Sequence, residues 1–124
     1  MTPAAETTDA AVEVVQRFNE AFNRGDVDAV MALMTEDCVF ENTSPAPDGE
    51  RHSGQREVRA FWEQFFSGTD SPHFESEDVF GCGDRVTVRW RFTWGGADAG
   101  HVRGVDVFRI LDGKVAEKLA YVKG

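Results

Sequence analysis

The sequence predicts an α+β domain in which helices pack on one face of a curved sheet. The apolar residues recur with a helical period of about 3.6 in the first half of the chain and with a strand period of about two from residue 73 onward. With 124 residues, of which 41% are hydrophobic, the chain is long enough for one hydrophobic core. We expect residues 9–124 to form this single domain and residues 1–8 to be a flexible N-terminus.

Two helices are expected at the start of the domain. Residues 9–24 place apolar side chains three or four positions apart, which gives one apolar stripe. Thr8 or Asp9 is a candidate N-cap, and Gly25 can end the helix in a left-handed conformation. Residues 26–34 repeat the pattern over a shorter span, with an aspartate at the first position as the candidate N-cap. The pair predicts a helical hairpin with a tight joint.

A short strand, a loop and a third helix are expected next. Residues 38–42 (CVFEN) read as a strand, and residues 43–54 (TSPAPDGERHSG) form a loop with two prolines and two glycines. A loop of this length in a small domain is often functional. Residues 55–66 have helical spacing again, and Gly68 can end this helix.

The second half of the chain predicts strands joined by turns. The clearest strand is residues 85–94, preceded by a weaker one at 73–80 and followed by strands at 101–110 and 115–122. A tight turn at 111–114 joins the last two. One face of the clearest strand is apolar and carries Val86, Val88, Trp90, Phe92 and Trp94. The other face carries Arg85, Thr87, Arg89, Arg91 and Thr93.

Charge and motifs limit the function classes. A formal net charge of −9 disfavours nucleic acid and anionic membranes as partners. No apolar run reaches the roughly 20 residues of a spanning helix, and the start of the chain has no leader pattern, so we expect a cytoplasmic protein. Cys38 and Cys82 have no metal-ligand spacing, and neither do the three histidines. Because nucleotide-binding glycine motifs are also missing from the sequence, we expect no metal and no cofactor.

The order of elements resembles a known family. The stretches GDVDAVMALMTEDCVFEN, HSG followed by VRAFW and FF, and DVFRILDGKVAEKLAYV are similar to the NTF2-like superfamily, within it to the SnoaL-like and ketosteroid-isomerase-like branch. The resemblance covers residues 9–123. It implies a cone in which a strongly bent sheet wraps the helices around a pocket. It also implies a homodimer that pairs through the outer face of the sheet.

The resemblance does not carry over the catalytic residues of this branch. The isomerases use a carboxylate base on the first strand, and a tyrosine and a protonated aspartic acid that donate to an oxyanion. Here Asn42 stands at the base, Phe18 at the tyrosine and Arg103 at the aspartic acid. An amide cannot abstract a proton at neutral pH, and a phenyl ring cannot donate a hydrogen bond. Ala120 stands where the cyclases and epoxide hydrolases of the superfamily have a key aspartate.

The resemblance also indicates which side chains line the pocket, and most of them are apolar or aromatic. These are Phe18, Phe40, Asn42, Trp62, Phe66, Trp90, His101, Arg103, Val105, Lys118, Ala120 and Val122. His52, at the end of the proline-rich loop, is a further candidate at the pocket entrance. Such a lining is typical of a site for a small hydrophobic or cyclic ligand.

Arg103 and His101 are the candidate catalytic residues. If Arg103 faces the pocket, its permanent charge needs an anion, which favours a ligand carboxylate or enolate. The alternatives are an ion pair with an acidic residue of the chain or a strand phase that turns the arginine to solvent. His101 lies two residues away on the same face, and a histidine is the side chain that most often acts as acid or base in catalysis. Glu41 neighbours Asn42 and points away from the pocket, unless a bulge shifts the strand and restores a carboxylate base.

Two functions fit these residues. One is a cofactor-independent isomerase, lyase or hydrolase that acts on a small apolar molecule with a carbonyl or carboxylate. The other is a non-catalytic ligand-binding or dimerisation module, favoured because both family base positions lack a carboxylate. Fold alone does not decide between them.

Overall fold

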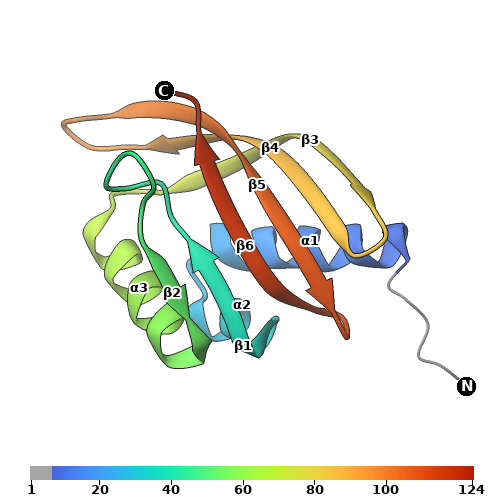
Figure 1. The fold of residues 1–124 in the computed structure, drawn as a ribbon. Helices are drawn as coiled ribbons and strands as arrows, with labels where there is room; N and C mark the ends of the chain where they lie inside the picture. The colour runs from blue at the N-terminus through green and yellow to red at the C-terminus, as the bar shows by residue number, and fades with distance from the viewer. Residues whose placement is uncertain (1–6) are drawn as a thin grey trace, which may run out of the picture.

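The computed structural model describes residues 7–124 and shows three helices and six strands in these residues (Figure 1). In chain order they are α1 (Thr8–Asn23), α2 (Val27–Ala32), β1 (Met34–Glu41), β2 (Arg51–Ser53), α3 (Gly54–Gly68), β3 (His73–Cys82), β4 (Arg85–Trp94), β5 (Gly100–Leu111) and β6 (Lys114–Val122). Most of the predicted flexible N-terminus lies outside the described residues, whereas Thr7 and Thr8 belong to the start of α1. In the described part of the chain, no helix is long and apolar enough to span a membrane.

The six strands form one sheet in the order β2-β1-β6-β5-β4-β3. All neighbouring strands are antiparallel except β1 and β6, which run parallel. The sheet bends strongly, and the helices lie on its concave face, with α1 behind β4 to β6 and α3 beside β1 and β2 (Figure 1). The predicted α+β class is therefore confirmed.

The ends of the first two helices follow from local side chains. The N-cap of α1 is Thr7, one residue before the expected candidates, and its side chain accepts a hydrogen bond from the Ala10 amide. Asp26 caps α2 as predicted by accepting from the Ala29 amide. Between the helices Gly25 has a φ of +68°, a conformation that favours glycine.

Two element boundaries differ from the prediction. The second helix ends at Ala32, and β1 already begins at Met34, four residues before the expected strand. Met34 is buried at the start of β1, and a short apolar run in the sequence does not distinguish a helical from a strand period. The three residues of β2 were expected in a loop because they are mostly polar. They form a strand by pairing with β1, where Phe40 lies opposite His52.

The core lies between the helices and the concave face of the sheet. The ring of Phe18 on α1 packs edge-on against Phe108 on β5, with ring centroids 5.8 Å apart, and both side chains are fully buried. Val86 and Val88 on β4 are buried on the same face, as predicted. Cys38 is buried in this core and free, and burial raises the pKa of its thiol.

Candidate functional site

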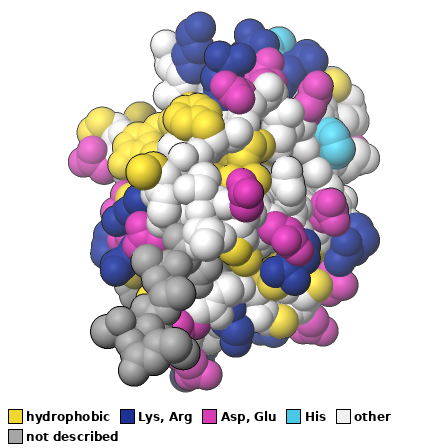
Figure 2. Space-filling model, turned by 90° about the vertical axis from the view of Figure 1, so that its right-hand side faces the viewer, with side chains coloured by type: hydrophobic (Ala, Val, Ile, Leu, Met, Phe, Trp, Pro, Cys, Tyr) yellow, Lys and Arg dark blue, Asp and Glu magenta, His cyan; other side chains and the backbone are white. Residues whose placement is uncertain are grey.

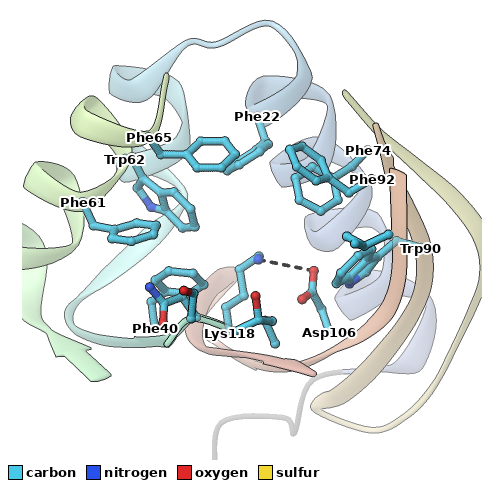
Figure 3. Close-up of a pocket in the computed structure, with 15 residues that line it drawn as sticks. Phe22, Phe40, Phe61, Trp62, Phe65, Phe74, Trp90, Phe92, Asp106 and Lys118 are labelled. Atoms are coloured by element: carbon cyan, nitrogen blue, oxygen red, sulfur yellow. Dashed lines mark ion pairs between the residues drawn. The ribbon is translucent and has the colours of Figure 1, made fainter. Parts of the chain in front are cut away.

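A cavity of about 200 Å³ opens between α1, α3 and the concave face of the sheet. Its walls are largely aromatic, and in Figure 3 the labelled rings surround a central hollow. The rings are Phe22 from α1, Phe61, Trp62 and Phe65 from α3, Phe40 from β1, Phe74 from β3, and Trp90 and Phe92 from β4. Asn42, Thr43 and Ser44 lie at the mouth, at the start of the proline-rich loop.

The floor of the cavity holds one buried ion pair. Lys118 Nζ on β6 lies 3.3 Å from Asp106 Oδ2 on β5, and these side chains are only 6% and 4% exposed. In the antiparallel register Lys118 is opposite Phe108, and Asp106 is opposite Ala120. The two charged residues are therefore diagonal neighbours on the same concave face. The dashed line in Figure 3 marks this pair.

Aromatic faces surround the ammonium group of Lys118. Its Nζ lies 4.9 Å from the ring centroid of Phe40 and 5.4 Å from that of Trp62. Three further rings, those of Phe22, Phe74 and Phe108, lie within 6.0 Å. The ring faces attract a cation and so offset part of the cost of its desolvation. The chain thus holds a charged amine inside an otherwise apolar chamber.

The carboxyl group of Asp106 is only partly satisfied. Within residues 7–124, Oδ1 of Asp106 and Nε1 of Trp90 make no hydrogen bond of ordinary geometry, although the two side chains lie close enough to interact. Burial raises the pKa of Asp106, while the Lys118 ammonium and the nearby Trp90 indole oppose that rise. Trp90 reaches this place because Gly104 faces it: a Cβ at Gly104 would lie 2.6 Å from the indole ring. An incompletely paired buried acid in a cavity is typical of a functional site.

The raised pKa of Asp106 gives stability a defined pH dependence. The folded chain retains the Asp106 proton at pH values where an unfolded aspartate, with a pKa of about 3.9, has lost it. Unfolding then releases a proton, so this group's contribution to stability falls as the pH rises from about 4. We expect the free energy of unfolding of the wild type, minus that of Asp106→Asn, to decrease with rising pH up to the folded pKa. Urea titrations of both proteins across this range measure it, and a difference that increases with pH would contradict the raised pKa.

The expected orientation of Arg103 is wrong. Arg103 lies on the convex face, where its Nε donates to Glu77 Oε1 at 3.1 Å and its Nη2 donates to Oε2. The guanidinium lowers the pKa of Glu77, chiefly through this hydrogen bond. Both alternatives thus describe Arg103: the strand phase turns it to the convex face, where its side chain is 54% exposed, and there it pairs with an acidic residue, Glu77.

The phase error on β5 has a physical reason. Arg103 was expected inside because the resemblance puts it at the position of the isomerases' aspartic acid, and Val105 and Val107 on the same face are compatible with burial. The opposite face carries Phe108 and Ile110, which are fully buried. Both faces of the strand are thus partly apolar, and the larger side chains occupy the core.

Other predicted site residues also lie outside the cavity. His101 and Val105 share the convex face with Arg103, and His101 is exposed. Phe18 is in the core below the cavity, and Phe66 packs against Phe22 without lining it. Val122 lines a second hollow, which shares Asn42, Thr43 and Ala120 with the cavity.

His52 stands at the edge of the site. Its ring lies 5.0 Å from that of Phe61 and 6.3 Å from that of Phe40, and it lines a surface groove next to the cavity. Phe40, Asn42, Trp62, Trp90, Lys118 and Ala120 all line the cavity itself, where the sequence analysis placed them. Their roles stay predictions.

The first strand has the expected phase near the site. Phe40 points into the cavity, whereas Glu41 points away and pairs with Arg51 at 2.8 Å. Asn42 stands at the cavity mouth, where its Oδ1 accepts from the Glu50 amide. The pairing of β1 with β6 is irregular only upstream, between Met34 and Val39. Glu41 is therefore not the carboxylate of this site.

Sequence reasoning missed Asp106 and several rings of the wall. The missed rings are Phe22, Phe61, Phe65, Phe74 and Phe92. Asp106 alternates with Phe108 and Ile110, so the two strongest core residues of its strand indicate its face. In residues 7–124 no group of three or more His, Cys, Asp or Glu side chains is arranged to hold a metal ion.

The bent sheet and the helices that cover it form a fold that is also found in known structures. The family model of the SnoaL-like domain matches residues 15–118, and the chain belongs to this family. An NTF2-like protein of unknown function from Mesorhizobium loti is 39% identical over 99% of this chain and 98% of its own, with a TM-score of 0.82.

More distant structures share the fold alone. A protein from Jannaschia sp. that is assigned as a SnoaL-like polyketide cyclase is 21% identical, over 99% of this chain and 92% of its own, with a TM-score of 0.80. An epoxide hydrolase from M. tuberculosis is 20% identical, over 94% of this chain and 84% of its own, with a TM-score of 0.79. No curated protein matches the sequence.

Proposed function

We propose that the cavity binds a small apolar, cyclic molecule with its carbonyl or carboxylate oxygen directed at Lys118. The observation that carries this proposal is a single buried amine at the floor of a chamber with aromatic walls. Aromatic faces take up flat or cyclic hydrocarbon parts, and the ammonium group donates a hydrogen bond to one oxygen. A ligand of this kind contacts the aromatic walls with its ring and accepts a hydrogen bond from Lys118 with its oxygen.

The size of the cavity supports a ligand of one or two rings. Its volume of about 200 Å³ is somewhat larger than the cavity of about 150 Å³ that holds benzene in an engineered protein. A second, more polar hollow adjoins the mouth and shares Asn42, Thr43 and Ala120 with the cavity. A polar substituent of the ligand fits this outer part.

The same floor supplies the groups for isomerase, lyase or hydrolase chemistry. Lys118 stabilises negative charge that develops on a carbonyl oxygen, and Asp106 accepts or returns a proton next to it. The arrangement differs from the predicted one, because Arg103 and His101 take no part. Simple binding without turnover uses the same contacts, and a screen for turnover of the bound ligands separates these two functions.

Calorimetry with a matched set of small ligands tests the binding proposal. We expect benzoate and cyclohexanone to bind more tightly than toluene, because a hydrogen bond to a charged group contributes about 1.5–3 kcal/mol. This difference corresponds to about 10- to 100-fold in affinity. In the double variant Lys118→Met with Asp106→Leu, the preference for the oxygenated ligands should disappear while toluene still binds.

The Arg103→Ala variant is the matched control. It removes a positive charge from the convex face and should leave the affinity of all three ligands unchanged. Equal affinity of toluene and benzoate for the wild type, or a preference that depends on Arg103 rather than Lys118, would overturn the proposed orientation.

We also propose that the chain pairs as a homodimer through the convex face of the sheet. Phe80 on β3 and Tyr121 on β6 are 56% and 53% exposed there, and Val105 lies opposite Tyr121. Exposed apolar groups of this size are typical of interaction surfaces. On the side of the molecule that Figure 2 shows, hydrophobic side chains also reach the surface, next to basic and acidic ones. Sedimentation of the wild type and of Tyr121→Glu tests this; a wild-type monomer at micromolar concentration contradicts it.

A further inference from the structure

We propose that Lys118 forms a covalent imine with ketones or aldehydes that enter the cavity, and that Asp106 moves the protons of this reaction. This inference rests on the proposed function, because the carbonyl compound must first bind between the aromatic walls. Among the ligands that the cavity accepts, ketones and aldehydes are the ones that react. Carboxylates bind at the same place but form no imine.

The surroundings of Lys118 are those of a reactive amine. The chain has three lysines, and the other two, Lys114 and Lys123, are exposed at the ends of β6. Nζ of Lys118 has one ionic partner, Asp106, and otherwise faces rings that neither accept nor donate protons. The remaining directions around the nitrogen point toward the cavity, as Figure 3 shows. A ligand carbonyl that enters the cavity therefore approaches this nitrogen directly.

A neutral amine is required for attack, and Asp106 supplies a place for the proton that must leave. Its Oδ2 already lies 3.3 Å from Nζ, and its buried Oδ1 makes no hydrogen bond of ordinary geometry within residues 7–124, with Trp90 as the neighbouring donor. Burial favours the protonated carboxyl. Transfer of one proton thus converts the ion pair into a neutral amine beside a carboxylic acid, which removes two opposite charges from an apolar chamber.

The reaction balances with these two side chains alone. The lone pair of Nζ attacks the carbonyl carbon, and the Asp106 carboxyl gives its proton to the oxygen. The carboxylate then takes a proton from the nitrogen and returns it to the hydroxyl group, which leaves as water. The products are a protonated imine on Lys118, an ionised Asp106 and one water molecule, so a charge pair is restored at the floor. No oxidant or reductant takes part.

The aromatic walls also favour survival of the imine. Hydrolysis requires water at the imine carbon, and the rings from α1, α3 and β4 that line the cavity leave less room for water beside a bound ligand. Exclusion of water protects reactive intermediates. Exposed lysines form imines too, but these hydrolyse freely in bulk solvent.

Reductive trapping tests the inference on the full chain. The wild type is incubated with cyclohexanone, reduced with sodium borohydride and mapped by peptide mass spectrometry. We expect one adduct, with the mass of the ketone less one oxygen, on the peptide that carries Lys118. Lys114, Lys123 and the N-terminal amine serve as internal controls with little label. Benzoate should suppress the adduct, because it occupies the cavity and cannot form an imine.

A variant of Asp106 shows whether this residue transfers protons or only holds Lys118 in position. Asp106→Asn keeps the shape of the side chain but holds no titratable proton, so trapping should slow relative to the amount of cyclohexanone bound, which calorimetry measures on the same variant. Faster or equal trapping in this variant would remove Asp106 from the mechanism. If the variant does not fold, the peptide map of the wild type still decides the identity of the reactive amine.

The outcomes distinguish this inference from the proposed function. Binding of cyclohexanone without an adduct overturns the imine and leaves the binding site intact. Label spread equally over the three lysines and the N-terminus also overturns it. If cyclohexanone neither binds nor reacts, both the imine and the proposed binding function fail.

Discussion

The Lys118→Met variant is expected to lose about 3–5 kcal/mol of unfolding free energy, because it leaves the Asp106 carboxyl buried without its counter-ion. Methionine is similar in length and apolar, so the aromatic rings that now surround the ammonium group still find a partner. The loss of unfolding free energy therefore comes from the unpaired Asp106 carboxyl and not from a cavity. Urea denaturation of the variant and the wild type at neutral pH measures it.

The double variant Lys118→Met with Asp106→Leu is the matched control. Replacement of both members of a buried pair by apolar groups is often neutral, or stabilising by about 1–4 kcal/mol. We expect the double variant to be at least as stable as the wild type. A single variant as stable as the wild type, or a double variant as unstable as the single one, would show that the pair is not coupled as the 3.3 Å distance indicates.

This comparison bears on why the chain contains the pair. If an apolar floor is at least as stable, then Lys118 and Asp106 do not serve the stability of the fold. Polar groups that reduce stability inside a cavity are typical of sites that bind or react. The proposed binding of a carbonyl or carboxylate accounts for both residues.

The fold was predictable from the sequence because its periodic segments are strong. The stripe with Val14, Phe18 and Phe22 indicates a helix, and the alternation of Val86, Val88 and Trp90 indicates a strand with one buried face. Both assignments hold in the structure. The short elements were less predictable: β2 exists through its pairing with β1, a contact that local sequence does not encode.

The site was only partly predictable because both faces of β5 contain apolar residues. The resemblance placed Arg103 in the pocket in error, and Val105 and Val107 on the same face did not contradict that placement. The concave face hides an aspartate whose partner, Lys118, comes from the next strand. The alternation of residues in the sequence predicts which side chains share a face of a strand. The register between paired strands decides which charged side chains of neighbouring strands lie next to each other. That register became known only from the structure.

Phe108→Ala is the second large prediction, and it concerns the layer that joins the core to the site. The Phe108 side chain is fully buried, packs edge-on against Phe18 and lies beneath the Lys118 ammonium, 6.0 Å from its ring centroid. Truncation of such a ring removes its packing and leaves a cavity, at a cost of about 3–5 kcal/mol in unfolding free energy. Chemical denaturation measures this cost, and a loss below 1 kcal/mol would contradict the assigned burial.

Phe80→Ala controls for the loss of a phenyl ring as such. Phe80 is also on the sheet, but its side chain is 56% exposed on the convex face, so its truncation should change the unfolding free energy by no more than about 0.5 kcal/mol. The two variants therefore differ only in which face of the sheet loses a ring. Because Phe108 supports the floor, its loss should also enlarge the cavity downward toward Phe18 and weaken the discrimination between benzoate and toluene. If Phe108→Ala is unstable but still binds benzoate more tightly than toluene by the wild-type factor, then the position of Lys118 does not depend on Phe108. Its ion pair with Asp106 would then suffice to hold it.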